Sequence, residues 1–205
     1  MLTGTLIVDG GAAVTAMLSN SAFVAVNIES PYMLEEEYLP FPDDDVPDFR
    51  TTMTEIYDAS IKLAVKILEI VGYALQLDDP QYFIKRHQSL LDRVTESYTT
   101  ARVLYYPPLP SIGDIKPGQL RCGEHVDYGS ITLLFQDPNG GLQPHRVLNP
   151  VDESIQRKSR QSLAIFIHPD NETVIECIDG SNKYPPITAY EDTYQRLFRT
   201  YKNNS

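Results

Sequence analysis

The chain has 205 residues, which suffice for one domain with a sizeable core, whereas two domains of this total length would each be small. The formal net charge of -11 repels phosphate backbones and anionic lipid surfaces, so nucleic-acid and membrane partners are not expected. Hydrophobic residues make up 42% of the chain, which is typical of a globular protein rather than a disordered one.

The cysteines and the first residues favour a cytoplasmic protein. Cys122 and Cys177 are far apart and form no CxxC metal pattern, so we expect free thiols in a reducing compartment, with a disulfide as the alternative. Residues 1–18 are rich in small and apolar side chains, but they lack a basic start and Asp9 interrupts them, which fits a signal peptide poorly. No run approaches the roughly 18 apolar residues that a membrane-spanning helix needs.

The first half of the chain predicts a long helix after an opening without a clear period. Acidic residues and prolines between Glu35 and Pro47 indicate a solvated connection. From about 51 to 77 apolar residues recur at helical spacing, which predicts an amphipathic helix with Asp48 near its N-cap. The apolar positions are Met53, Ile56, Tyr57, Ile61, Ala64, Val65, Leu68, Val71 and Leu75.

A second helix is predicted over residues 81–94, with Pro80 at its entrance. His87 follows two basic residues on this helix, so we expect it to be an exposed helix residue. The side chains expected to face inward are Phe83, Leu90, Leu91 and Val94.

The second half of the chain is predicted to be mainly β-structure. Runs of β-branched and aromatic residues punctuated by Pro and Gly predict strands over 99–106, 129–136, 162–168 and 173–178. Thr188 and Glu191 form a capping box that predicts a final helix with an aromatic-rich apolar face. The fold class is therefore α+β, with helices that flank an antiparallel β core.

Three residues have the types and spacing of a metal site. His125 and Asp127 lie two apart before a predicted strand, and in an extended chain such residues point to the same face. His145 follows, and two histidines with one carboxylate on one face of an iron(II) ion leave positions open for O2 and a bidentate acid. An isolated HxD pair, however, is more often an ordinary pair of surface polar residues.

Several longer strings share this part of the chain. They are Tyr105-Tyr106-Pro107-Pro108, His125-Val126-Asp127-Tyr128-Gly129, Gly140-Gly141-Leu142-Gln143, His145-Arg146-Val147-Leu148-Asn149-Pro150 and Arg160-Gln161-Ser162. Together they resemble the isopenicillin N synthase-like branch of the iron(II)/2-oxoglutarate-dependent dioxygenases. The resemblance runs from about Glu35 nearly to the C-terminus.

The resemblance implies roles for six residues. His125, Asp127 and His145 match the three iron(II) ligands. Arg160 matches the arginine that holds the distal carboxylate of 2-oxoglutarate, and its planar fork suits bidentate pairing. Ser162 and Tyr106 match the hydroxyl groups that assist it. The family often has an asparagine two residues before that tyrosine, and this chain has Leu104 there.

The residues alone also allow plainer interpretations. Arg160 lies close to Arg157 and Lys158, and without the resemblance this basic cluster is best interpreted as an exposed turn. His168 stands before Pro169 and Asp170 at a predicted strand end, where we expect a structural role.

The chain departs from the family between the HxD pair and the distal histidine. In the family's double-stranded β-helix, a form of jelly roll, these ligands come from the second and seventh of eight strands, and the path between them needs about 35 to 45 residues. Here 19 residues, 126–144, separate them. We therefore expect an incomplete jelly-roll domain over 35–205 with an internal deletion near 143–145, resembling a skipped exon, after a divergent segment over 1–34.

The resemblance implies an enzyme that uses iron(II) and 2-oxoglutarate to oxidise an unidentified small organic substrate with O2, releasing succinate and CO2. One alternative is a catalytically inactive truncated isoform that acts, if at all, through protein association. Another is an oxidase that uses iron and O2 without 2-oxoglutarate. Missing inner strands open one wall of the pocket and favour the inactive form. The sequence does not indicate an oligomeric state.

Overall fold

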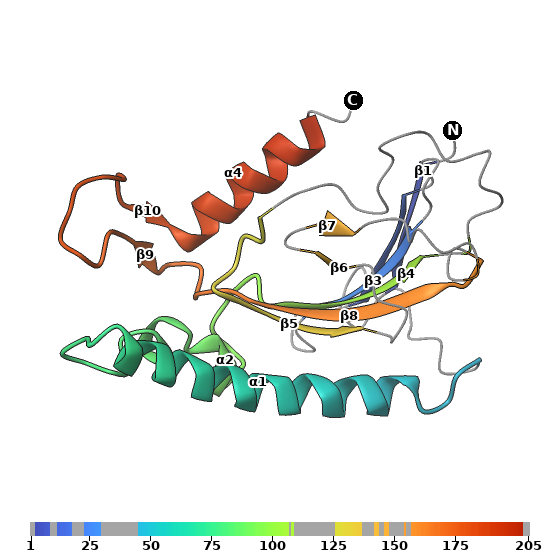
Figure 1. Ribbon diagram of the computed structural model, residues 1–205, viewed down its shortest axis with the longest axis horizontal. Helices are drawn as coiled ribbons and strands as arrows, with labels where there is room; N and C mark the ends of the chain where they lie inside the picture. The colour runs from blue at the N-terminus through green and yellow to red at the C-terminus, as the bar shows by residue number, and fades with distance from the viewer. Residues whose placement is uncertain are drawn as a thin grey trace. The chain divides into compact units, whose positions relative to one another are not determined.

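The computed structural model describes most of the chain outside three stretches near the N-terminus and around residues 107–125 and 137–156 (Figure 1). Side chains and backbone are described for residues 45–106, 108, 126–136, 154 and 157–196. The backbone alone is described for residues 197–202 and for β1 Thr3–Val8, β2 Ala12–Met17, β3 Phe23–Glu29, β6 Leu142–Gln143 and β7 Arg146–Val147.

The chain divides into two compact units. The first, called here the sheet unit, consists of Met1–Arg50, Thr100–Asp127 and Leu134–Ile165. The second, called the helical unit, consists of Thr51–Thr99, Tyr128–Leu133 and Phe166–Ser205.

A six-stranded sheet has the order β1-β2-β3-β4-β8-β5, and most of its residues belong to the sheet unit (Figure 1). Three strands of this sheet carry residues of the candidate site described below. They are β4 Thr100–Tyr106, β5 Ile131–Gln136 and β8 Arg160–Ile167. Strands β1 to β4 pair antiparallel in sequence order, with Val14 opposite Val26 and Val26 opposite Val103. β6 and β7 form a separate two-stranded antiparallel sheet.

The direction of β8 relative to β4 follows from the contacts at their ends. Thr99, just before β4, exchanges hydrogen bonds with the backbone of His168, just after β8, at 3.0 and 3.2 Å. At the other ends, the guanidinium carbon of Arg160 lies 5.0 Å from the centre of the Tyr106 ring. The two strands therefore run in opposite directions, and this brings the first residue of β8 beside the last residue of β4.

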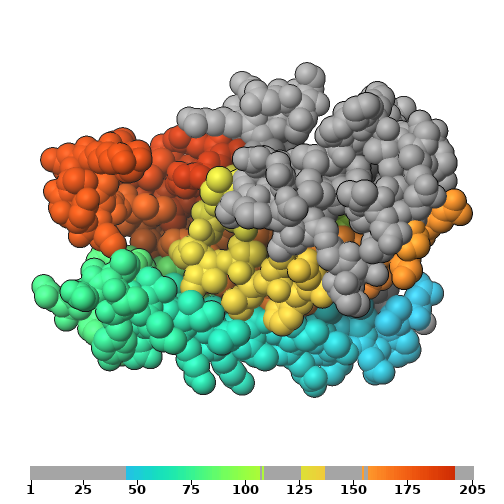
Figure 2. Space-filling view, in the orientation of Figure 1, coloured from blue at the N-terminus to red at the C-terminus, as the bar shows by residue number. Residues whose placement is uncertain are grey.

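The long helix of the helical unit lies where the apolar spacing predicts it, as α1 Phe49–Ala74. Asp48 directly precedes it, as expected for the N-cap region. Its buried face consists of Met53, Tyr57, Ser60, Ile61, Ala64, Leu68 and Gly72. Leu75 lies beyond the helix end and is exposed, so its predicted place on the buried face is wrong. The outer surface of α1 is visible along its length in Figure 2.

The second predicted helix is broken, which corrects the prediction over 81–94. The structure has a 3-10 turn, η1 Ile84–Arg86, followed by one helical turn, α2 Ser89–Asp92. Leu90 is buried as predicted, but Leu91 is 53% and Val94 84% exposed. Local polar contacts replace helical ones, because the Asp170 carboxylate accepts the backbone N–H groups of residues 88 and 89 at 2.7 and 2.9 Å.

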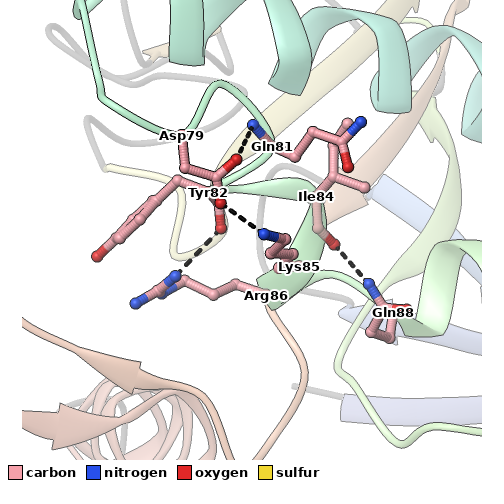
Figure 3. A network of polar contacts seen from close by, with 7 residues as sticks. All are labelled: Asp79, Gln81, Tyr82, Ile84, Lys85, Arg86 and Gln88. Atoms are coloured by element: carbon pink, nitrogen blue, oxygen red, sulfur yellow. Dashed lines mark hydrogen bonds and ion pairs between the residues drawn. The ribbon is translucent and has the colours of Figure 1, made fainter.

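A network of polar contacts fixes the turn before η1 (Figure 3). The Asp79 carboxylate accepts hydrogen bonds from the Gln81 backbone N–H at 3.0 Å and from Lys85 Nζ at 2.7 Å. These contacts lower the pKa of the Asp79 carboxyl below its ordinary value, the Lys85 hydrogen bond contributing most. The Arg86 guanidinium lies 3.5 Å from the centre of the Tyr82 ring, a cation–π contact. The segment is therefore well defined although it is not one continuous helix.

The C-terminal part contains the short pair β9 Val174–Ile175 and β10 Ile187–Thr188, followed by α4 Ala189–Lys202. The strand predicted over 173–178 is thus only two residues long. The Glu191 backbone N–H donates to Thr188 Oγ1 at 3.2 Å, which confirms Thr188 as the helix cap. Tyr190 stacks on Tyr98 and on Tyr194, with ring centres 5.8 and 6.1 Å apart.

Mixed helices and antiparallel sheets confirm the α+β class. Within the described ranges, no helix combines the length and apolar character needed to cross a bilayer. Cys177 forms no disulfide with another described residue, and Cys122 lies outside the described residues, so the predicted free thiols are supported at Cys177 only.

Candidate carboxylate site

The centre of the candidate site is Arg160, the first residue of β8. Its side chain is only 3% exposed, and Ser162, two residues along on the same strand face, is also buried. Gln161 between them faces the other way and is exposed, as are the nearby Arg157 and Lys158. The exposed-turn interpretation therefore holds for Arg157 and Lys158 and is wrong for Arg160.

Side chains from three neighbouring strands surround the Arg160 guanidinium. Arg160 Nη1 donates to Ser162 Oγ at 3.3 Å, and Nη2 donates to Gln136 Oε1 at 3.1 Å. The buried ring of Tyr106 lies beside the guanidinium carbon at 5.0 Å. Because β8 lies between β4 and β5, the last residue of each neighbour, Tyr106 and Gln136, meets the first residue of β8.

This cluster has the chemistry of a carboxylate site. A guanidinium presents parallel N–H donors that match the two oxygens of a carboxylate, and charge-assisted contacts of this kind are about 2.7–2.9 Å long. The distances to Ser162 and Gln136 are longer, and these two side chains are neutral. A ligand carboxylate is therefore a stronger acceptor than either group. The Tyr106 and Ser162 side chains also carry hydroxyl groups suited to such a ligand.

The predicted metal ligands are only partly described. Asp127 is described and half-buried, whereas His125 and His145 lie outside the described residues. Among the residues that the structure describes, no three His, Cys, Asp or Glu side chains gather in a way that could hold a metal ion. The iron(II) triad thus remains a prediction from the sequence.

The turn that follows Asp127 is anchored within the helical unit. The Ser130 backbone N–H donates to the Ile167 carbonyl at 2.7 Å. At Gly129, a Cβ atom would lie 2.4 Å from the same carbonyl oxygen and 3.1 Å from the His168 ring, so only glycine allows this approach. The Arg196 guanidinium of α4 lies 5.9 Å from the centre of the Tyr128 ring.

His87 also contacts this turn, and the prediction of an exposed residue is wrong. The imidazole is 2% exposed, with Nδ1 2.7 Å from the Phe83 carbonyl oxygen and Nε2 2.9 Å from Ser130 Oγ. Burial lowers the pKa of His87 below its ordinary value, and the Phe83 hydrogen bond and the Asp170 charge offset only part of that effect. The ring is therefore neutral at pH 7.

The lowered pKa of His87 makes stability depend on pH. Below about pH 6.5, the ordinary value, the unfolded chain takes up a proton at this residue before the folded chain does. We therefore expect the free energy of unfolding to fall as the pH drops through about 6.5, by at most about 1.4 kcal/mol per pH unit from this group, until the folded pKa is passed. Urea unfolding at several pH values should show a shallower dependence for His87→Gln than for the wild type. Parallel profiles would contradict the assignment.

His168 has the structural role that its position predicts. It is buried, and its backbone is held by Thr99, just before β4. Sequence reasoning missed Gln136, although its position as the last residue of a strand beside β8 is a usable signal. It also missed His87, for which the helical period was misleading.

Comparisons with known proteins agree with the chemistry of the site. No family model matches the chain. The 2-oxoglutarate-dependent dioxygenase htyE of Aspergillus rugulosus is 34% identical over 109 residues, which cover 53% of this chain and 30% of htyE. The 2-oxoglutarate-Fe(II) type oxidoreductase ppzD of Metarhizium rileyi is 25% identical over 209 residues, which cover 78% of this chain and 56% of ppzD. The chain thus spans about half or less of the length of these relatives.

Solved structures show the same likeness. A full-length protein of Neurospora crassa, crystallised in complex with alpha-KG, matches with a TM-score of 0.72 and 25% identity, over 86% of this chain and 66% of that one. A putative 2OG-Fe(II) oxygenase family protein of Caulobacter crescentus matches in fold, with a TM-score of 0.67 and 21% identity, over 90% of this chain and 72% of that one.

Fold and site thus define an oxygenase-like chain with a buried arginine suited to a carboxylate. The chain is similar in sequence to 2-oxoglutarate-dependent dioxygenases and in fold to a 2OG-Fe(II) oxygenase family protein, as its motifs predict. The isopenicillin N synthase-like branch is compatible with these matches.

Proposed function

We propose that this protein is an iron(II)- and 2-oxoglutarate-dependent dioxygenase that oxidises a small organic substrate. The observation that carries the proposal is the buried Arg160 with Ser162 on the same strand face and Tyr106 beside it. In this proposal Arg160 binds the distal carboxylate of 2-oxoglutarate, Ser162 and Tyr106 supply hydroxyl contacts, and Gln136 gives up its contact with Arg160 or shares it.

Iron(II) would be held by His125, Asp127 and His145. Two imidazoles and one carboxylate are the donor set that non-haem iron(II) oxygenases use, which supports the assignment. Bound iron(II) would supply the activation of O2, with one oxygen atom going to succinate and the other to the substrate while 2-oxoglutarate loses CO2. The contribution of the chain is to bind and orient the cosubstrate and to bury its distal carboxylate.

We propose further that the core is an incomplete double-stranded β-helix over 35–205, shortened near 143–145, after a divergent segment over 1–34. The alignment with ppzD supports an internal shortening. The alignment is 209 positions long, and 78% of 205 residues is about 160. About 49 positions of the alignment are therefore gaps in this chain.

The same shortening favours a second candidate, a non-catalytic relative that acts, if at all, through association with other proteins. Strands that are missing between the HxD pair and the distal histidine would remove support for the third ligand. If the protein is the dioxygenase, we propose that it uses O2 and works in the cytoplasm. A third candidate is an oxidase that uses iron and O2 but not 2-oxoglutarate.

An anaerobic titration tests the proposal. Iron(II) is added to the full chain with 2-oxoglutarate, and the visible metal-to-ligand charge-transfer band is followed for the wild type and for His145→Ala. We expect a band in the wild type that His145→Ala weakens. His168→Gln is the matched control, because His168 is a histidine with a structural role and should retain the band.

The possible results separate the candidates. A folded wild type that shows no band and consumes no O2 when loaded with iron(II) would overturn the enzyme and leave the non-catalytic relative. Consumption of O2 with no band and no succinate would favour the oxidase, because the band requires 2-oxoglutarate bound to iron(II). Circular dichroism of each variant ensures that a missing band does not simply reflect an unfolded chain.

A further inference from the structure

The His87 ring is held at both of its nitrogen atoms in the helical unit. The Phe83 carbonyl oxygen can only accept a hydrogen bond, so Nδ1, 2.7 Å away, must carry the proton. In the neutral ring Nε2 is then an acceptor, and the Ser130 hydroxyl donates to it at 2.9 Å. Ser130 itself is exposed. The fixed end of this contact is therefore the buried imidazole.

The backbone around His87 is held as firmly as its ring. The His87 N–H donates to the Ile84 carbonyl at 3.0 Å, and the Asp170 carboxylate accepts the next two N–H groups of the chain. The Asp170 N–H in turn donates to the Arg86 carbonyl at 2.9 Å. A side chain fixed in this way can restrain the position of the residue to which it is hydrogen-bonded.

The residue it contacts is the last of the turn Asp127-Tyr128-Gly129-Ser130. Other described contacts also hold this turn. The close approach of Gly129 to the Ile167 carbonyl and the hydrogen bond of the Ser130 N–H to the same carbonyl lie on the backbone. The Arg196 guanidinium lies 5.9 Å from the centre of the Tyr128 ring. The His87 contact adds a side-chain hydrogen bond from a residue 43 positions away in sequence.

We propose that His87 is a positioning residue that, through Ser130, holds the turn from which the Asp127 carboxylate projects. The effect on metal binding rests on the proposed function, in which Asp127 is an iron(II) ligand. The effect on the turn itself does not. Loss of the His87–Ser130 contact loosens residues 127–130 and weakens metal binding without unfolding the helical unit.

Hydrogen–deuterium exchange of the metal-free full chain tests the effect on the turn. Asparagine places an amide near the Nδ1 position of histidine and glutamine places one near Nε2, so His87→Asn should lose the Ser130 contact and His87→Gln should keep it. We expect exchange in the peptide spanning 126–133 to be about 5- to 10-fold faster in His87→Asn and in Ser130→Ala, which corresponds to one hydrogen bond of ordinary strength. His87→Gln should stay close to the wild type.

A double variant separates positioning from general stability. If both residues act through one contact, His87→Asn with Ser130→Ala should exchange no faster than either single variant. Leu90→Ala is the control, because it removes a buried apolar side chain from the same segment and leaves both ring contacts in place. Additive effects, or an equal local change in Leu90→Ala, would overturn the proposal.

Cobalt(II) affinity, measured by calorimetry on the same variants, tests the effect on the metal. We expect affinity about 10-fold weaker in His87→Asn and in Ser130→Ala, at the lower end of the range for residues that orient ligands, and near wild type in His87→Gln. Wild-type affinity in both weakened variants would overturn the metal part of the proposal. A folded wild type that binds no cobalt(II) would instead count against the proposed function, and the exchange data would still decide whether His87 holds the turn.

Discussion

Arg160→Leu is expected to weaken 2-oxoglutarate binding by about 100-fold or more. The reason is that hydrogen bonds between charged groups contribute about 1.5–3 kcal/mol each, and a guanidinium that binds a carboxylate bidentately makes two of them. Calorimetric titration of the anaerobic, iron(II)-loaded protein with 2-oxoglutarate measures the loss. Circular dichroism must confirm that Arg160→Leu is folded, because the substitution removes the hydrogen bonds that Ser162 and Gln136 receive from the guanidinium.

Two matched variants make the result specific. Arg160→Lys keeps the charge but not the planar fork, and we expect an intermediate loss of about 10-fold. Arg157→Leu removes an arginine that is exposed three residues earlier, and it should bind as the wild type does. If Arg157→Leu and Arg160→Leu lose affinity equally, the effect is one of overall charge and Arg160 does not form the carboxylate site.

The burial of Arg160 shows how far the site could be predicted from the sequence. The residues alone favoured an exposed basic turn, and the family resemblance favoured a ligand-binding role. The structure excludes the exposed turn for Arg160 for a local reason, because period-two alternation along β8 turns Arg160 and Ser162 to the buried side and Gln161 to the exposed side. The ligand-binding role stays a prediction. Arg157 and Lys158 stand before the strand begins, where no such alternation applies.

The residues that sequence reasoning misplaced are those whose positions depend on distant contacts. The apolar spacing over 81–94 fits a helix, yet Asp170 captures the backbone N–H groups of residues 88 and 89 and the helix breaks there. His87 lies between η1 and α2, at the break, and is buried there. β1 to β3 were missed for another reason, since small and β-branched residues that pair with one another on a sheet show little alternation of apolar and polar side chains.

Gly129→Ala is expected to cost about 1–3 kcal/mol of unfolding free energy, the usual range for an added methyl group in a site without space. The added Cβ would lie 2.4 Å from the Ile167 carbonyl oxygen, and backbone must move to relieve this clash. That carbonyl also accepts the Ser130 N–H at 2.7 Å, so a shift that makes room weakens this hydrogen bond as well. Thermal unfolding should show the change, at about 2–4 °C of Tm per kcal/mol for a chain of this size.

Gly180→Ala is the control for this effect. Gly180 has a positive φ of 71° and no atom within 4 Å of an added Cβ, so alanine there causes backbone strain of about 1 kcal/mol but no clash. If iron(II) binds through Asp127, Gly129→Ala should weaken iron(II) binding as well, because Gly129 lies two residues after that carboxylate in the same turn, whereas Gly180→Ala should leave iron(II) binding unchanged. Wild-type stability in Gly129→Ala would mean that the turn can move at no cost in free energy. It would contradict the view that the contacts with the Ile167 carbonyl restrain this turn.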